Sequence, residues 1–202
     1  SYFPNWNLIF LVVIKPLLTD HCYNEELSKG SDFWGHTLQG LVKLYCSHFS
    51  NFVENTYATE EWLTFLAALQ YFSSSTSTEV AFVAIENYRS LLAFATKLEV
   101  FPSEVLDKCI EIWSGYRIVY GDITDSSGSY SRKSGYDCIE ELINAFPCLY
   151  QIIVKYNGIS VEFVEKSLSL FYSAVRYPLL PEHIRDSNKP SSLQAAVLSG
   201  LK

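Results

Sequence analysis

Two groupings of ligand-type and nucleophilic side chains in the sequence could support metal or thiol chemistry. His21-Cys22 lies near Glu25-Glu26, which gives metal-ligand residue types, but a zinc site needs four convergent ligands and the other histidines are remote. Cys46 and His48 could form a thiol–histidine pair, but residues two apart on a helix do not face each other. We therefore expect solvated or partly buried side chains at both places, with no metal and no cofactor.

Two pairs of adjacent carboxylates, Glu60-Glu61 and Glu140-Glu141, have the residue types for acid–base catalysis. Both pairs fall in the first turn of an expected helix, where the helix dipole and capping account for acidic residues. The sequence also lacks a nucleophile elbow, a phosphate-binding loop and a dinucleotide-binding turn. The prediction is that the chain is not an enzyme.

Charge and hydropathy exclude several classes of partner. The net charge is −7 and the 15 Lys and Arg residues are scattered, with Arg132-Lys133 the longest basic run, so nucleic acid and anionic membrane surfaces are disfavoured. The most apolar stretch, residues 8–18, is interrupted by Lys15 and Pro16. It is shorter than the ~20 apolar residues of a membrane span.

The remaining composition points to a piece of an intracellular protein. Five cysteines without a C-x-x-C spacing predict reduced thiols in a cytosolic protein. Charged residues make up only 18% of the chain and no initiator methionine is present. We expect from this that the chain is a segment of a larger protein, with part of its surface covered there.

Apolar residues spaced three and four apart predict helices in most of the chain. The expected segments are 31–52, 60–69, 80–92, 103–113, 137–157, 160–171 and 191–201. Helix starts are indicated at Thr59, Ser103 and Ser160, with capping boxes at Thr76–Glu79 and Ser191–Gln194. Pro147 is expected to kink or restart its helix. The predicted core consists of Trp34, Leu38, Leu41, Trp62, Phe65, Leu69, Val83, Leu91, Leu106, Ile110 and Phe163.

The predicted helix starts recur at a regular interval. From Ser31 to Ser77 is 46 residues and from Thr59 to Ser103 is 44, which is the period of HEAT and armadillo units. The fold class predicted is all-α, with antiparallel helix pairs in a HEAT/armadillo-like right-handed array. We expect residues 1–202 to form one repeat segment, with a mobile insertion loop near 121–135 and a proline-bounded segment at 177–202.

Candidate protein-binding residues lie around the insertion loop and at the two ends of the chain. Aromatic side chains beside a loop can form a contact surface, although they can equally fill a helix groove. The end segments carry more apolar residues than solvent-facing helices need. The candidates are Trp6, Tyr116, Tyr120, Tyr130, Leu193 and Leu198.

Four stretches of the sequence have a recognisable packing pattern. They are residues 31–41 (SDFWGHTLQGL), 61–66 (EWLTFL), 79–88 (EVAFVAIENY), and 177–178 (YP) followed by 190–198 (PSSLQAAVL). These stretches resemble the helical repeats of the large Arf guanine-nucleotide exchange factors, and they are most similar to the non-catalytic Golgi branch of that family. Nothing in the chain matches the Phe-Arg-Leu-Pro-Gly-Glu-like stretch that carries the family's exchange activity.

The resemblance implies a scaffold segment of a peripheral protein of Golgi and endosomal membranes that works in vesicle transport. Its implied partners are an Arf-like small GTPase and a Dopey-type protein. Two alternatives stay open: a helical domain that regulates a neighbouring exchange module in cis, and a helical domain that encloses a lipid or small ligand in its aromatic core. A cavity of several hundred cubic ångströms would favour the last, because packed interiors rarely contain such voids.

The serine-rich stretch at residues 122–134 generates a first prediction. Because it offers few apolar side chains to bury, limited proteolysis with trypsin should cut first near Arg132-Lys133. Mass spectrometry of the earliest fragments measures this. Early cleavage inside a predicted helix, with 132–133 intact, would contradict the predicted boundaries.

Overall fold

The computed structural model describes residues 6–22, 31–48, 58–75, 77–118, 134–156, 158–178 and 189–201, without the side chains of 6–7, 20–22, 31–34, 47–48 and 58. The helices are α1 (Trp6–Ile9), α2 (Lys15–Cys22), α3 (Ser31–His48), α4 (Ala58–Ser73), α5 (Thr78–Ala95), α6 (Ser103–Gly115), α7 (Gly135–Tyr156), α8 (Val161–Val175) and α9 (Ser192–Gly200). A π-helical turn, η1 (Phe10–Ile14), joins α1 to α2. No strand occurs in these ranges, so the all-α prediction is confirmed for them.

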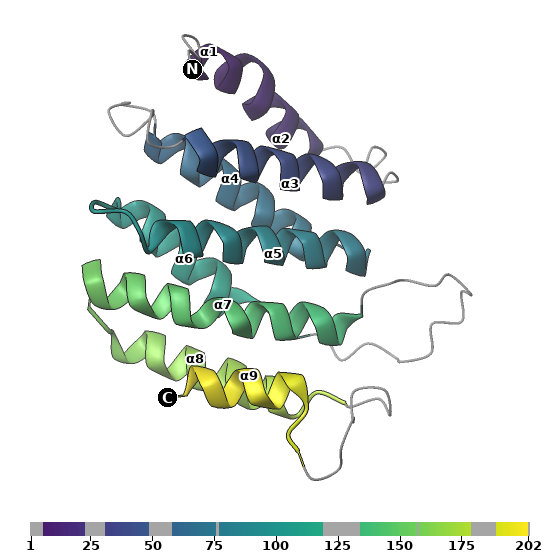
Figure 1. Cartoon of the computed structure of the whole chain (residues 1–202), viewed down its shortest axis with the longest axis vertical. Helices are drawn as coiled ribbons and strands as arrows, with labels where there is room; N and C mark the ends of the chain where they lie inside the picture. The colour runs from purple at the N-terminus through teal and green to yellow at the C-terminus, as the bar shows by residue number, and fades with distance from the viewer. Residues whose placement is uncertain are drawn as a thin grey trace.

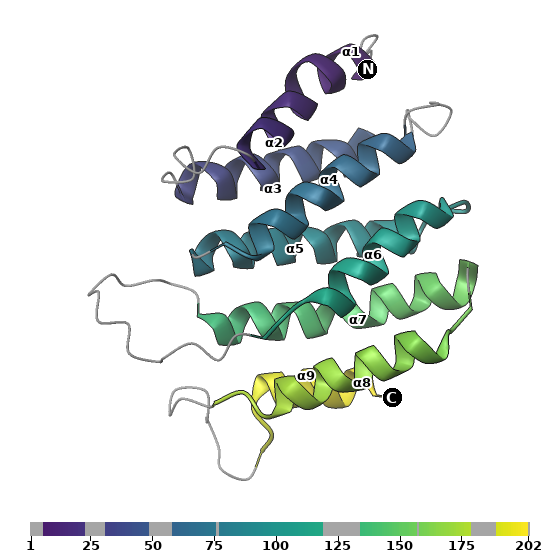
Figure 2. The ribbon, with the colours of Figure 1, turned by 180° about the vertical axis from the view of Figure 1, so that it is seen from behind.

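The helices alternate between two layers stacked along the long axis of the molecule. Helices α3, α5, α7 and α9 lie side by side in one layer (Figure 1). Helices α4, α6 and α8 form a row in the other layer, and α2 continues that row beyond α4 (Figure 2). The two termini therefore lie at opposite ends of the stack.

Elements α1, η1 and α2 follow one another without a break and form what is here called the N-terminal rod. The rod accommodates a proline through its π turn. Lys15 N–H bonds to the Phe10 carbonyl, five residues earlier, instead of to the residue four earlier. The next residue, Pro16, has no N–H to continue an α-helical ladder. The rod buries Phe10, Ile14 and Leu18 against the rest of the stack.

Serine side chains cap several helices where the sequence indicated them. Ser160 accepts a hydrogen bond from Phe163 N, and Ser191 forms the predicted capping box with Gln194. At α5 the cap is Ser77, which accepts from Val80 N, so the predicted Thr76–Glu79 box is not the cap. Thr59 lies inside the first turn of α4 and is not its cap, because that helix already begins at Ala58.

Helix α7 departs from the prediction at its start and in its middle. It begins at Gly135, where the carboxylate of Asp137 accepts from the backbone and hydroxyl of Ser134 at 2.8 Å each. It then continues through Pro147 to Tyr156 without restarting, because its long apolar face packs against α5 and α9 and outweighs one missing backbone bond. Two residues beyond this end, Gly158 has a φ of 72°, which suits glycine, and its N–H donates to the Ile153 carbonyl at 2.8 Å. The predicted insertion loop falls almost entirely at 119–133, outside the described residues.

Aromatic side chains connect one layer to the other. Trp62 of α4 contacts Tyr45 of α3 and Phe101, with ring centroids 5.6 and 5.4 Å apart, both edge to face. Further along the stack, Trp113 of α6 lies 4.9 Å from Phe146 of α7. Such pairs stabilise by about 0.5–1.5 kcal/mol beyond the area they bury.

Most of the predicted core residues are buried. The fully buried ones are Leu38, Trp62, Phe65, Leu69, Leu91, Leu106 and Phe163, while Leu41, Val83 and Ile110 are half-buried at the edge of the core. The side chain of Trp34 lies outside the described residues. A regular apolar period therefore identified the inward faces of these helices well.

The central aromatic contacts generate a second prediction. Replacing Trp62 or Phe65 by Ala should lower the free energy of unfolding by about 3–5 kcal/mol, through lost burial and the cavity left behind. Urea denaturation followed by circular dichroism measures this, with the exposed Tyr71→Ala as control. A loss below 1 kcal/mol for both core variants would be incompatible with the packing described.

Candidate interaction surface

The two carboxylate pairs do not form acid–base pairs, because their four members point to four different elements. Glu60 forms an ion pair with Lys15 of α2. Glu61 is buried near Tyr45. Burial of the Tyr45 hydroxyl raises its pKa, and the nearby Glu61 charge raises it further. Glu141 pairs with Arg89 of α5 at 2.5 Å. Glu60 and Glu141 therefore join helices to one another.

The other carboxylate, Glu140, belongs to a small network that fixes α9 on α7. Glu140 accepts a hydrogen bond from Ser192 Oγ at 2.6 Å. Tyr136 Oη accepts from Leu193 N at 2.9 Å, which satisfies one backbone donor at the start of α9. With Leu193 and Val197 buried beneath it, α9 is firmly seated and its opposite face is left outward.

Of the thiol and histidine candidates, Cys46 is the one whose side chain is described, and its thiol is not activated. Burial raises the pKa of Cys46 to about 11, with Lys97 lowering it slightly, so its thiolate is scarce at neutral pH. The side chains of His21, Cys22 and His48 lie outside the described residues. Among the residues that are described, no group of three His, Cys, Asp or Glu side chains could hold a metal ion.

Three of the six predicted protein-binding residues have described side chains, and these three differ in exposure. Tyr116 follows α6 directly and is half-buried against the core, which raises the pKa of its hydroxyl. Leu193 is 1% exposed and belongs to the core, whereas Leu198 is 54% exposed on the outer face of α9. The side chain of Trp6 and all of Tyr120 and Tyr130 lie outside the described residues.

Helix α8 has a second apolar face that nothing in the described chain covers. Its inner face buries Phe163, Ser167, Leu170, Phe171 and Ala174. A row of exposed apolar side chains, here called the α8 row, follows its outer face at spacings of three and four: Val161, Val164, Leu168, Tyr172 and Val175. Leu168, at the centre, is 51% exposed. This regular spacing is that of a helix surface on which another helix can pack.

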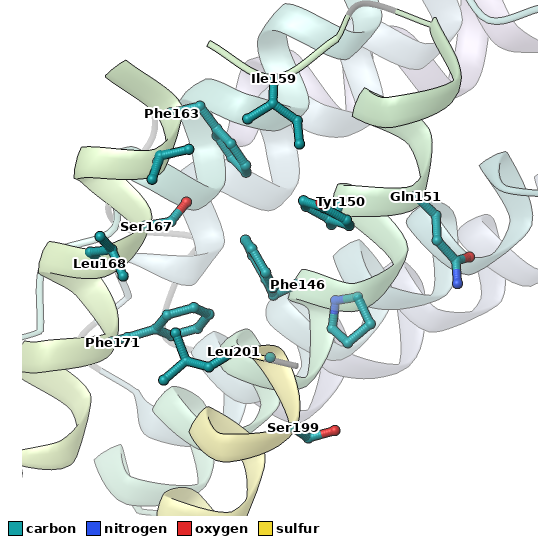
Figure 3. Close-up of a pocket in the computed structure, with 13 residues that line it drawn as sticks. Phe146, Tyr150, Gln151, Ile159, Phe163, Ser167, Leu168, Phe171, Ser199 and Leu201 are labelled. Atoms are coloured by element: carbon teal, nitrogen blue, oxygen red, sulfur yellow. The ribbon is translucent and has the colours of Figure 1, made fainter. Parts of the chain in front are cut away.

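A groove of about 530 Å³ lies beside the α8 row, between α7, α8 and the end of α9. Figure 3 shows the rings of Phe146, Phe163 and Phe171 around it, with the Ser167 hydroxyl directed between them. None of its lining side chains is charged. Its volume is in the range that favours the ligand-binding alternative, but the groove opens to the surface and does not enclose a ligand within the core.

Gly200 allows α9 to approach the groove closely. A Cβ at this position would lie 2.9 Å from Phe171 Cζ and 3.4 Å from Phe146 Cδ1. Because real Cβ atoms do not approach ring atoms so closely, a side chain here would displace the rings. The absence of a side chain at residue 200 therefore sets the shape of this wall.

A second apolar patch occupies the N-terminal end of the stack. Leu8, Leu11, Val12 and Val13, here called the N-terminal patch, are all exposed on the outer side of the rod. Clustered exposed apolar side chains are typical of interaction surfaces. In the described part of the chain, no helix is long and apolar enough to cross a bilayer.

The sequence analysis placed candidate contact residues at the two ends of the chain but did not identify the α8 row. The sequence predicted a helix at 160–171 with Phe163 in the core, but not that Val164 and Leu168 would form an exposed apolar face on it. The signal was present, because apolar residues occur nearly all round this helix. A helix with that pattern is one that is covered on more than one side.

The fold and this surface define an all-helical, two-layer array with apolar side chains exposed at both ends. The chain is 50% identical over 199 residues, or 98% of its length, to Protein MON2 of Saccharomyces cerevisiae. The match spans 12% of that relative's length. No family model and no solved structure matches the chain. The resemblance to a MON2-type relative of the Arf exchange factors is thus confirmed for this region.

Two leucines that differ in burial generate a third prediction. Leu193→Ala should lower the free energy of unfolding by about 2–5 kcal/mol, because Leu193 is buried between α9 and α7. Leu168→Ala removes the same atoms from a half-exposed position and should cost less than about 1 kcal/mol. Urea denaturation of both variants compares them directly. Equal losses would show that the α8 row is covered within the chain itself.

Proposed function

We propose that the chain is a non-enzymatic scaffold segment of a peripheral Golgi and endosome trafficking protein. Its helices would pair antiparallel in a HEAT/armadillo-like right-handed array. Helix α5 begins 47 residues after α3, and α6 begins 45 residues after α4, which agrees with that class of repeat. The intervals from α5 to α7 and from α6 to α8 are longer, because residues 119–133 lie between α6 and α7.

The observation that carries the proposal is the exposure of regular apolar side chains at both ends of the stack. The N-terminal patch and the α8 row are formed by side chains that would otherwise be expected in a core. Among the described residues, Glu60, Glu140 and Glu141, which were candidates for acid–base catalysis, are used in bonds between helices. A contact surface for other protein segments accounts for both features.

The partners follow from the resemblance to the non-catalytic exchange-factor relatives. They are an Arf-like small GTPase and a Dopey-type protein, bound on the cytoplasmic side of Golgi and endosomal membranes. The match to 12% of the MON2 relative supports a segment that acts within a much longer polypeptide. Regulation of a neighbouring exchange module in cis is an alternative that no contact in this chain favours.

Binding by purified partners tests this function and is the fourth prediction. The chain should capture an Arf-like GTPase or a Dopey-type protein, and Val12→Asp in the N-terminal patch should weaken capture at least about tenfold. The reason is that a charge inserted into an apolar contact must be desolvated. Ala67→Asp, on an exposed site of α4, is the matched control.

Melting temperatures separate loss of binding from loss of folding. Both Asp variants should melt within a few degrees of the parent chain, since each changed side chain is exposed. Failure of the parent chain to bind either partner would contradict the proposed function. Unchanged binding by Val12→Asp would place the contact elsewhere on the array.

A further inference from the structure

The packing of α8 against the helices before it shows which kind of contact is missing at the exposed end of the stack. In the row α2, α4, α6, α8, each member packs against the previous one. Helix α8 inserts Phe163 and Phe171 between α6 and α7. Their rings lie 6.2 and 5.7 Å from Trp113 of α6, and 6.0 and 4.9 Å from Phe146 of α7. A groove left by two helices is thus filled by aromatic side chains of the next helix in the row.

One step further along the stack, the same arrangement is present without its last member. Helices α8 and α9 stand in the places that α6 and α7 hold one step earlier, and the 530 Å³ groove borders them. The α8 row runs beside that groove, with Val164 and Leu168 belonging to both. From Val161 to Val175 the row is about 21 Å long at a rise of ~1.5 Å per residue, so a neighbouring helix of similar length would cover it.

A buried hydroxyl at the groove adds a polar requirement. Ser167 is 4% exposed, and its Oγ has no hydrogen-bond partner among the described residues. A buried polar atom without a partner costs about 1–3 kcal/mol. An occupant that brings a donor or acceptor beside its apolar body would remove that cost, as the indole N–H of Trp or the hydroxyl of Tyr can.

We propose that the next position in this row is occupied by an amphipathic helix that lies along α8 and inserts a Trp or Tyr side chain into the groove. Its source is the polypeptide that continues beyond the matched segment in the full-length protein. This inference rests on the proposed function, since it treats the chain as part of a longer array. A small apolar ligand would fill the groove but leave Val161, Tyr172 and Val175 exposed.

Reactivity of a cysteine placed in the α8 row tests the proposal. Leu168→Cys is introduced into the 202-residue chain and into the same chain extended beyond residue 202 by roughly 45 residues, one helix-pair period, of its own full-length polypeptide. The rate of maleimide labelling at residue 168 is measured by mass spectrometry, which separates it from the native cysteines. Val100→Cys, in the exposed turn between α5 and α6, is the control.

The extension should slow labelling at residue 168 at least tenfold and leave labelling at residue 100 within twofold. An unchanged rate at residue 168 would overturn the proposal. So would slow labelling of the unextended chain that depends on its concentration, which would assign the row to a second copy, or slowing by phosphatidylcholine vesicles, which would assign it to lipid. None of these outcomes bears on capture of the GTPase or Dopey-type protein, so the two proposals fail separately.

Discussion

The structure depends on one constraint: a helix in a single row must bury apolar side chains on both flanks. Trp113 shows how this is met, because its ring packs against Phe146 of the other layer and against Phe163 of the next helix in its own row. Its indole N–H donates to the Leu142 carbonyl at 3.1 Å, so the polar edge is satisfied inside the core. Each helix is therefore stabilised by the helices that come before and after it, and an end helix remains incomplete.

Polar groups reinforce the same dependence. Tyr88 donates to the Cys109 carbonyl at 2.7 Å, which ties α5 to α6, and the Arg89–Glu141 pair ties α5 to α7. A partly buried pair of this kind helps to fix one arrangement of helices, because breaking it leaves a poorly solvated charge. Titratable groups are used in this way as structural bonds. The functional features that remain on the described surface are shape and apolar area, which suit contact with other protein segments.

The sequence predicted the helical fold and the inner faces because both follow from local rules. The caps Ser160 and Ser191 were found because a serine before an apolar period has few other structural roles. The position of Pro147 inside a continuous helix was not found, because tertiary packing outweighed a local penalty. The α8 row was missed for a related reason: periodicity identifies apolar faces, but it does not say which neighbour covers each of them. Leu193 was placed at the surface because the sequence does not show that α9 turns it toward α7.

The central claim is that the exposed end of the array is an internal seam of a longer stack. An electron cryomicroscopy map of full-length Saccharomyces MON2, interpreted at the region matching this chain, tests that claim most directly. The account predicts a helix along the counterpart of α8, with an aromatic side chain in the counterpart of the groove beside Phe146 and Phe171. A map in which that face of α8 meets solvent, or is covered by something other than a helix of the same polypeptide, would contradict it.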